Sequence, residues 1–323
     1  MRRVLSWVLA GVLLGGAACH RQRDCGGAPE QAVRLALNWF PEAEHGGFYA
    51  AQVRGLFAEA GVPVEILGGG PDAPVIQRVA TGDVTFAVTN ADDVLLARAQ
   101  QVPVVALMAS YQVNPRCIMV HTDSGIESIA QLRDVTLAMS PRPAFSHYLR
   151  RRFALEGVRI VPYPGNVTQF LLDHRYAQQG YVFSEPYVAR SRGADPRALL
   201  VAETGFSPYA SVLIATEETL RLHPQRVGAV VRATVRGWEE YLRDPALANE
   251  EIHRLNPEMP LDILAHGARE SRPLVLDTAA QQHGIGHMTQ ERWETLVAQL
   301  VEAQLISPGA VEAGRAYTTA FLP

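Results

Sequence analysis

Lysine is absent from this sequence: all 29 basic residues of the 323-residue chain are arginines. A Schiff base to a carbonyl substrate, or to pyridoxal phosphate as an internal aldimine, needs a lysine amine, so enzymes of these classes are excluded. An excess of positive charge is absent as well, because the formal net charge is −4. The chain lacks the basic footprint of nucleic-acid binding, and we expect neither a nucleic-acid partner nor a bound cofactor.

Cysteine is scarce, and three cysteines are too few for a disulfide framework. Cys117 stands in the apolar stretch RCIMV, which predicts a buried strand with the cysteine as a small core residue. Long apolar runs are scarce too. After the first residues, no run approaches the roughly 20 apolar residues that a helix needs to cross a bilayer. We therefore expect a globular protein that is soluble once it has been processed.

The N-terminus carries the pattern of an export signal. Two arginines follow the initiator methionine, the apolar run Val4–Leu14 comes next, and the small residues GGAAC end at Cys19. This pattern resembles a bacterial lipoprotein signal, in which the cysteine becomes the lipidated first residue. Ordinary cleavage after Ala18 and an uncleaved anchor are the alternatives. We predict a signal peptide over 1–18 and a flexible tether over 19–31, with a protein that is exported and either periplasmic or held at the membrane by lipid.

From residue 32 onward, strand and helix patterns alternate. A strand-like VRLALN is followed by a helical pattern over 45–60, and further strand–helix pairs continue to about residue 111. The alternation restarts at Arg116, and from Glu217 nearly all of the chain is helical, with Thr289 as a predicted N-cap. The pattern predicts an α/β protein whose mostly parallel sheets are covered by helices on both faces, divided into two lobes.

Polar and aromatic residues gather where the predicted strands end. The first such stretch, LNWFPEAEHGGFY, combines a tryptophan, two carboxylates and a histidine. Ligands of open α/β sheets bind beyond the carboxyl ends of the strands. We expect the binding site to be built from the strand-to-helix turns at 38–45, 68–74, 89–93, 139–146 and 184–187.

Four segments carry a resemblance to a known family. They read LNWFPEAEHGGFYAAQVRGLFAEAGVPVEI, VATGDVTFAVTNADDVLLARAQQVPVVAL, YVFSEPYVARSRGADPRALLVAE and MTQERWETLVAQLVEAQLI. These segments resemble solute-binding proteins of ABC importers, in the branch that captures pyrimidine precursors of thiamine and is related to nitrate, sulfonate and taurine binders. The resemblance extends over about residues 32–323. It implies a small-molecule ligand and, as partner, an ABC permease with its ATPase.

The resemblance also implies a fold. Family members are two-lobed clamps with the type II periplasmic-binding-protein fold, hinge crossovers and a helical C-terminal part. Carried onto this chain, the first lobe is discontinuous and comprises 32–116 and 215–323, while the second lobe comprises 117–214. We expect the chain to cross between the lobes near 114–119 and 211–215. Closure of such hinges around a ligand is what a permease recognises.

Candidate ligand contacts in the first lobe begin with the aromatic residues. Trp39 and Tyr49 are candidates for stacking on a flat ring, although Tyr49 also fits the buried face of its helix. Asn38 either reads the donors and acceptors of that ring or is a turn residue. Asn90 and Asp92 follow another strand end, where each is either a ligand contact or a cap of the next helix.

In the second lobe, Glu185 follows a strand directly and precedes Tyr187. Its carboxylate accepts from ring or amino N–H groups of a ligand, or it is an N-terminal helix charge that the helix dipole favours. Arg142 lies between two prolines in MSPRPAFS, which lack N–H donors. It either recognises an acidic group or is a rim charge. We include Glu185, Tyr187 and Arg142 among the predicted ligand-binding residues.

A metal site is not expected. Glu42, Glu44 and His45 lie too close in sequence to converge easily on one ion, and the glycines within HGIGH (283–287) make a rigid helical histidine pair doubtful. His45 is predicted to be a supporting hydrogen-bond partner in the ligand site. Glu42 and Glu44 are predicted to be solvent-side charges at a helix start.

The sequence favours a binding protein over an enzyme. It contains no Gly-x-Ser-x-Gly elbow, no phosphate-binding loop and no His-Glu-x-x-His motif. The related fold family includes an enzyme that makes the thiamine pyrimidine with a lysine-bound pyridoxal phosphate, and the missing lysine argues against that role. We expect delivery of a small heteroaromatic solute to an ABC importer. The alternatives are a binder of sulfonate or nitrate, which needs Arg142 or Arg116 deep in the cleft, and an exported enzyme or sensor.

Overall fold

A computed structural model of the protein describes residues 32–323. The predicted signal peptide, the lipidation site Cys19 and the tether lie outside these residues. Within 32–323, no helix combines the length and the apolar character that crossing a membrane requires. Cys117 is a buried free cysteine, as predicted, and burial raises the pKa of its thiol.

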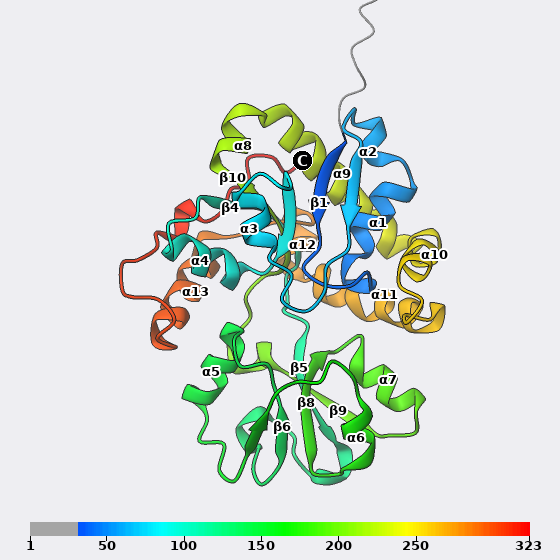
Figure 1. Ribbon diagram of the computed structural model, residues 1–323, viewed down its shortest axis with the longest axis vertical. Coiled ribbons are helices and arrows are strands. Elements are labelled where there is room, and N and C mark those ends of the chain that lie inside the picture. The colour runs from blue at the N-terminus through cyan, green and yellow to red at the C-terminus, as the bar shows by residue number, and fades with distance from the viewer. Residues whose placement is uncertain (1–31) are drawn as a thin grey trace, which may run out of the picture. The chain divides into compact units, whose positions relative to one another are not determined.

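The described chain builds two five-stranded sheets, which confirms the predicted α/β class (Figure 1). The strand order of the first sheet is β2 (Val64–Leu67), β1 (Val33–Ala36), β3 (Phe86–Thr89), β10 (Ala210–Thr216) and β4 (Val104–Tyr111). The order of the second is β7 (Arg159–Val161), β6 (Thr136–Ala138), β8 (Tyr176–Tyr181), β5 (Arg116–His121) and β9 (Pro196–Leu200).

One strand in each sheet runs against its neighbours. β10 pairs antiparallel with β3 and β4, and β5 pairs antiparallel with β8 and β9. The other strand pairs within the described residues are parallel: β1 with β2 and β3, and β6 with β7 and β8. The reversed strands are the ones that the chain enters directly after it has crossed from the other sheet. The turns that follow the other strands therefore gather at the edge of each sheet where the chain crosses.

The two crossings lie between β4 and β5 and between β9 and β10. The first falls at residues 112–115, close to the expected position. The second falls at 201–209, earlier than the expected 211–215, because β10 already belongs to the first sheet from Ala210 onward. The predicted lobe limits stay a prediction.

Helices cover both faces of the first sheet. Figure 1 shows α3, α4 and α13 on one face, with α1, α9 and α10 on the other. Their bounds are α1 (Gly46–Val53), α2 (Leu56–Glu59), α3 (Val75–Ala80), α4 (Ala91–Ala99), α8 (Glu217–Leu222), α9 (Pro224–Arg243), α10 (Ala246–Leu255), α11 (Leu261–Val275), α12 (Thr278–His283) and α13 (Gln290–Glu302). The second sheet carries α5 (Ala144–Arg152), α6 (Thr168–Leu172) and α7 (Glu185–Ser191). Short 3-10 turns are η1 (Ala43–His45), η2 (Thr122–Ser124), η3 (Ile129–Gln131), η4 (Val201–Thr204) and η5 (Ala313–Arg315).

The helix predicted over 45–60 is interrupted. It forms η1, α1 and α2, and Gly55 between the two helices adopts a left-handed φ of 72°. A continuous helix needs a negative φ at each position, so this residue ends α1 and redirects the chain. By contrast, the predicted N-cap at Thr289 is confirmed, since its side chain accepts from the Arg292 backbone N–H at the start of α13.

The helix pair α1–α9 is packed closely because glycines lie in its interface. A Cβ atom on Gly46 or Gly47 would collide with the rings of Tyr241 and Trp238, which are both fully buried. On the other helix, a Cβ atom on Gly237 would lie 2.6 Å from the Ala51 Cβ atom. The two glycines of the EHGGF stretch therefore serve packing, and they fix the position of the turn that precedes α1.

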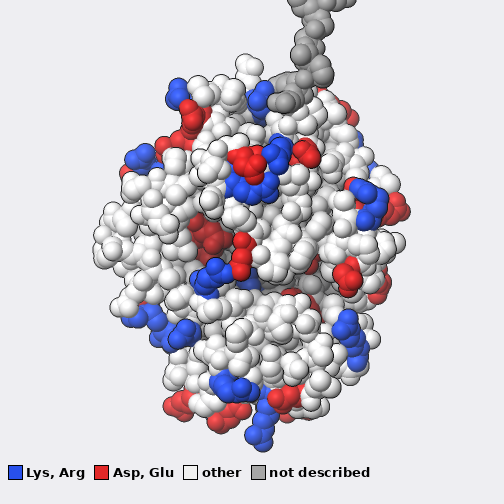
Figure 2. All heavy atoms as spheres, viewed as in Figure 1, with Lys and Arg blue, Asp and Glu red and all other residues white. Residues whose placement is uncertain are grey.

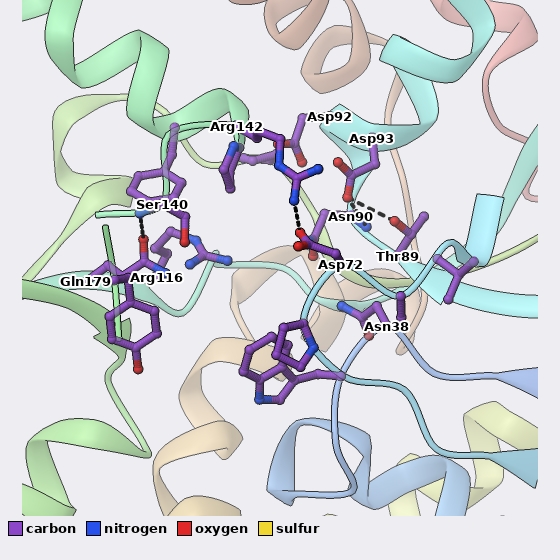
Figure 3. A pocket seen from close by; sticks show the side chains of 18 of the residues that line it. Asn38, Asp72, Thr89, Asn90, Asp92, Asp93, Arg116, Ser140, Arg142 and Gln179 are labelled. Carbon is purple, nitrogen blue, oxygen red and sulfur yellow. Dashed lines mark hydrogen bonds and ion pairs between the residues drawn. The ribbon is translucent and has the colours of Figure 1, made fainter. Parts of the chain in front are cut away.

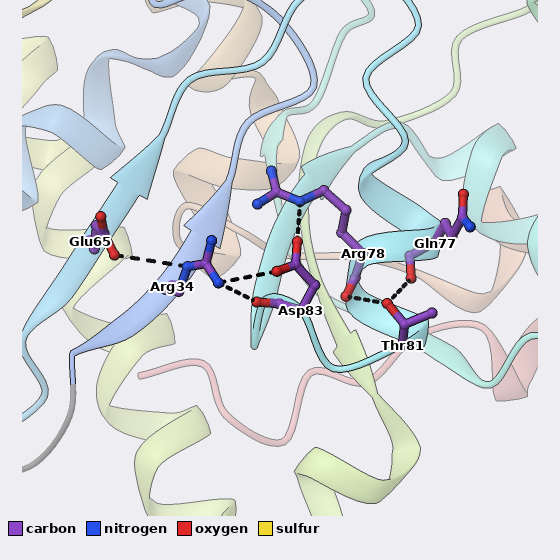
Figure 4. Close-up of polar contacts among 6 residues, drawn as sticks. All are labelled: Arg34, Glu65, Gln77, Arg78, Thr81 and Asp83. Atoms are coloured by element: carbon purple, nitrogen blue, oxygen red, sulfur yellow. Dashed lines mark hydrogen bonds and ion pairs between the residues drawn. The ribbon is translucent and has the colours of Figure 1, made fainter.

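An exposed ion-pair cluster joins the starts of the first strands (Figure 4). Arg34 on β1 contacts Asp83 at 3.1 Å and Glu65 on β2 at 3.9 Å. Arg78 on α3 donates to Asp83 at 2.6 Å, and this hydrogen bond lowers the pKa of the Asp83 carboxyl. The cluster lies at the end of the first sheet opposite the strand-end turns, so it belongs to the scaffold.

A matched pair of substitutions in α9 tests the close packing. We expect Gly237→Ala to lower the free energy of unfolding by roughly 1–3 kcal/mol, because the added methyl group overpacks the contact with α1. Gly228→Ala in the same helix meets only the flexible end of Arg232, so we expect no loss and a gain of up to about 1 kcal/mol from helix propensity. Urea unfolding of both variants measures the difference, and equal stabilities would contradict the packing account.

Candidate functional site

A cavity of about 1000 Å³ lies at the strand ends of the two sheets. All five predicted turns contribute to its lining. Figure 3 labels residues from the turns at 38–45, 68–74, 89–93 and 139–146. Other parts of the chain line the cavity as well. Among them are the first crossing with Asn114, the start of β5 with Arg116, the turn 162–165 after β7, and residues 179–181 at the end of β8. The faces of α3 and α4 and the second crossing, 201–208, also contribute. The motif VPYPG after a predicted strand was a signal for the turn 162–165. The crossing and β8 residues carry no comparable pattern.

Asn38 and Trp39 line the cavity, and His45 supports Asn38 from behind. His45 is fully buried, and its Nε2–H donates to Asn38 Oδ1 at 3.1 Å. Burial lowers the pKa of His45 to about 3, so the ring is neutral at physiological pH. His45 does not line the cavity. Its position fits the predicted supporting role, because it fixes which way the Asn38 amide points.

Tyr49 and Tyr187, both predicted ligand contacts, do not line the cavity. Tyr49 is fully buried, because α1 turns this face toward α9 and α10. Tyr187 stacks on His266 of α11, with ring centroids 4.1 Å apart. Helix packing directs both rings away from the strand ends, so in this structure neither lies where the predicted ligand contact would be made.

Glu42 and Glu44 are not the solvent-side charges that the sequence predicted. They are 8% and 1% exposed, and both line the cavity. Burial raises the pKa of both carboxyls. Ser211 Oγ donates to Glu44 Oε1 at 2.7 Å, and Ser211 itself has a left-handed φ of 46°. A non-glycine residue in that conformation is strained, and such strain concentrates at functional sites.

The turn after β3 holds one carboxylate in place and leaves another open. Asp93 accepts from Thr89 Oγ1 at 2.9 Å, and Asn90 Oδ1 accepts from the Ser211 backbone at 3.4 Å, so these side chains are engaged in the turn itself. Asp92 is 7% exposed, and its Oδ1 has no hydrogen-bond partner within the described residues. Burial and the neighbouring Asp93 raise the pKa of Asp92 to about 7. Asp92 thus contributes a buried acceptor without a protein partner to the cavity lining.

Glu185 lines the cavity, but protein donors already occupy both of its oxygens. Tyr163 Oη donates to Oε1 at 2.6 Å, and the Tyr181 backbone N–H donates to Oε2 at 2.8 Å. Glu185 therefore orients Tyr163, an aromatic cavity residue outside the predicted ligand contacts.

The two arginines of the cavity differ in their surroundings. The Arg116 guanidinium lies between two rings, 4.6 Å from the centroid of Phe145 and 4.8 Å from that of Tyr181. Arg142 pairs instead with Asp72 from the turn after β2, and both side chains are mostly exposed (Figure 3). Arg142 thus lies at the rim, where it joins turns of the two sheets.

Among the charged residues of the lining, acidic ones outnumber arginines. Six line the cavity, against two arginines, and they are Glu42, Glu44, Asp72, Asp92, Asp93 and Glu185. Figure 2 shows acidic atoms recessed in the hollow on the viewed face, with arginine atoms beside them. Buried carboxylates favour ligand groups that donate hydrogen bonds or carry positive charge. The cavity therefore offers acceptors together with the aromatic surface of Trp39, Phe145, Tyr163 and Tyr181.

Comparison with known proteins places this geometry in a family. The chain is 27% identical to a riboflavin-binding protein of Chloroflexus aurantiacus, over 91% of this chain and 86% of that one. It is 24% identical to a formylaminopyrimidine-binding protein of Halalkalibacterium halodurans, over 92% of each. A 4-amino-5-hydroxymethyl-2-methylpyrimidine phosphate synthase of Saccharomyces cerevisiae is 22% identical over 72% of this chain and 73% of its own.

Solved structures agree on the fold. The periplasmic nitrate-binding protein of Synechocystis superposes with a TM-score of 0.68 at 10% identity, over 91% of this chain and 88% of that one. This likeness confirms the periplasmic-binding-protein fold that the sequence predicted. The model of the NMT1/THI5-like family matches residues 42–248, which is more than half of the chain. The chain therefore belongs to the NMT1/THI5-like family.

Proposed function

We propose that the protein is an exported solute-binding protein of an ABC importer, and that its ligand is a flat nitrogen heterocycle of the pyrimidine or flavin kind. The observation that carries the proposal is the free acceptor of Asp92 in a cavity that also holds Trp39. Ring N–H and amino groups satisfy such acceptors, while the faces of the ring stack on the aromatic residues. The names of the relatives that bind riboflavin and formylaminopyrimidine support this ligand class.

The cavity volume bears on the size of the ligand. Small-molecule pockets run from about 300 to 1,000 Å³. A cavity of about 1000 Å³ has room for a three-ring flavin as well as for a single pyrimidine ring. We therefore keep both as ligand candidates. A single pyrimidine ring would leave part of the cavity empty, and closure of the two lobes would then remove this space. The first lobe of the proposal comprises 32–116 and 215–323, and the second comprises 117–214.

A small-anion ligand is the second candidate, because Arg116 lines the cavity as that alternative required. The surroundings of Arg116 weaken it. The cation already stacks between two rings and faces the carboxylates of Asp92, Glu44 and Glu185. Arg116 therefore already has acidic partners within the cavity, and this disfavours its use for sulfonate or nitrate.

A binding role is favoured over catalysis. Some relatives are named as synthases, yet the lysine on which a pyridoxal phosphate aldimine depends is missing throughout this sequence. The remaining parts of the proposal follow from the sequence. We propose that a signal peptide directs export, that Cys19 is lipidated, and that an ABC permease with its ATPase receives the ligand from the closed protein.

A ligand screen by thermal unfolding tests the ligand class. We expect pyrimidines or flavins to raise the unfolding temperature, since a ligand at 100 times its dissociation constant stabilises the folded state by about 2.7 kcal/mol. Taurine and nitrate are tested in parallel as anionic ligands, and we expect them to leave the unfolding temperature unchanged. A shift with the anions alone would overturn the proposal, and chemical turnover of the ligand in the same mixture would favour an enzyme.

Substitution of Trp39 tests the aromatic contact. Loss of stacking on a heterocycle costs about 1–3 kcal/mol, so we expect Trp39→Ala to raise the dissociation constant by about 5- to 150-fold. Phe40→Ala is the control, because this neighbouring ring is half exposed and does not line the cavity. Isothermal titration calorimetry compares them. Unchanged binding by the Trp39 variant would remove the tryptophan from the site.

The pH dependence of binding tests the role of Asp92. The raised pKa means that the free protein holds a proton on Asp92 below about pH 7, whereas a donor group of the ligand needs the charged carboxylate. Affinity therefore rises with pH, and we expect roughly tenfold weaker binding at pH 6 than at pH 8 for a ligand that does not itself titrate there.

The unfolded chain loses the proton of Asp92 near pH 4, so the stability of the ligand-free protein falls as pH rises from about 4 to 7.

The control variants separate this effect from other titrations. Asp92→Asn should weaken binding at pH 8 and flatten the profile, whereas Asp72→Asn at the exposed rim should preserve the slope. A profile that keeps its slope in Asp92→Asn would assign the titration to another group.

A further inference from the structure

Two histidines and an aspartate meet at the end of the second sheet that is remote from the cavity. His121 is the last residue of β5, Asp123 lies in η2, and His174 lies in the loop between α6 and β8. One ligand atom from each of the three lies within 4.8 Å of those from the others. β5 begins at Arg116 in the cavity lining, so five strand residues, about 17 Å, separate the cluster from the cavity.

The buried member of the cluster is held ready to act as a ligand. His121 is 5% exposed, and its ring stacks on Phe170 with the centroids 3.9 Å apart and the planes 7° from parallel. Its Nε2–H donates to the Phe170 carbonyl oxygen at 2.8 Å. A carbonyl that accepts from one ring nitrogen fixes the tautomer and leaves a lone pair on Nδ1. Histidines that bind metals commonly have this outer hydrogen bond.

The other two members can approach the first. The His174 ring lies against His121, with centroids 4.7 Å apart and planes 29° from parallel. Its Nδ1 lies 3.0 Å from Asp123 Oδ2. Both side chains are largely exposed. His174 lies in a loop, and Asp123 lies in the three-residue turn η2. A tetrahedral ion with bonds of about 2.0–2.1 Å needs its ligand atoms about 3.3 Å apart. Side-chain rotations that move the ligand atoms by roughly an ångström would bring all three to this spacing.

We propose that His121, Asp123 and His174 form a binding site for a divalent transition metal ion, with Zn²⁺ as its best fit. Two imidazoles and one carboxylate are the ligand types that Zn²⁺ takes, and water fills the fourth position. The single negative charge of Asp123 complements the cation. The bound ion ties the end of β5 to the loop before β8, two segments about 50 residues apart. The site is independent of the proposed transport function.

The test uses the full chain, stripped with a chelator and titrated with ZnCl₂ at pH 7.5 by calorimetry. We expect one ion to bind with a micromolar or lower dissociation constant and to raise the unfolding temperature. His174→Gln and Asp123→Asn should each weaken binding at least tenfold. Both positions are exposed, so the variants should fold, which unfolding in the absence of metal checks.

The controls address other sources of affinity. His283 and His287 are a second stacked pair, with centroids 4.5 Å apart, and the double variant His283→Gln/His287→Gln should keep the zinc affinity of the unaltered protein. The affinity for the heterocycle in the cavity should not change with zinc. The proposal is overturned if the unaltered protein binds no zinc, or if His174→Gln and Asp123→Asn bind it as tightly as the unaltered protein does. In that case Asp123 and His174 form only a surface hydrogen bond.

Discussion

The arrangement of the molecule depends on one constraint: each sheet contains a strand that arrives from the other sheet and runs against its neighbours. β5 and β10 are these strands, and each is hydrogen-bonded on both sides. A strand that enters a sheet at the crossing edge must run away from that edge. The turns after the opposite strands then lie at the crossing. Side chains from turns more than 100 residues apart are thereby brought to one cavity.

Several carboxyl groups of the cavity are buried, although such groups are mostly exposed in proteins. Glu42, Glu44 and Asp92 are buried, and burial raises the pKa of each. Protein donors such as the Ser211 hydroxyl offset part of the desolvation free energy of these carboxyl groups. Asp92 Oδ1 has no such donor within the described residues. An unsatisfied buried acceptor destabilises the ligand-free protein, and a ligand donor relieves it. The same groups thus lower stability and provide selectivity.

Supporting residues decide how the cavity residues point. His45 fixes the Asn38 amide, and Glu185 fixes Tyr163. The glycines of α1 let Tyr241 and Trp238 approach the helix backbone closely. This packing fixes the position of the turn that precedes α1. Rigid support of this kind reduces the conformational entropy that a ligand must otherwise overcome on binding.

The sequence by itself determined the α/β class, the strand-end location of the site and the family, because hydrophobic periodicity, turn residues and distributed segments are local properties of the chain. It also identified Asn38, Trp39 and Asp92 as cavity residues. Only the tertiary structure decided which neighbours those residues have. Glu42 and Glu44 are polar and lie at a helix start, which locally predicts exposure, yet both are buried, because α11 packs against η1. Tyr49 has an aromatic ring that could stack on a ligand, but α9 and α10 pack over it. His121 and His174 are 53 residues apart, and only the antiparallel pairing of β5 with β8 brings them together.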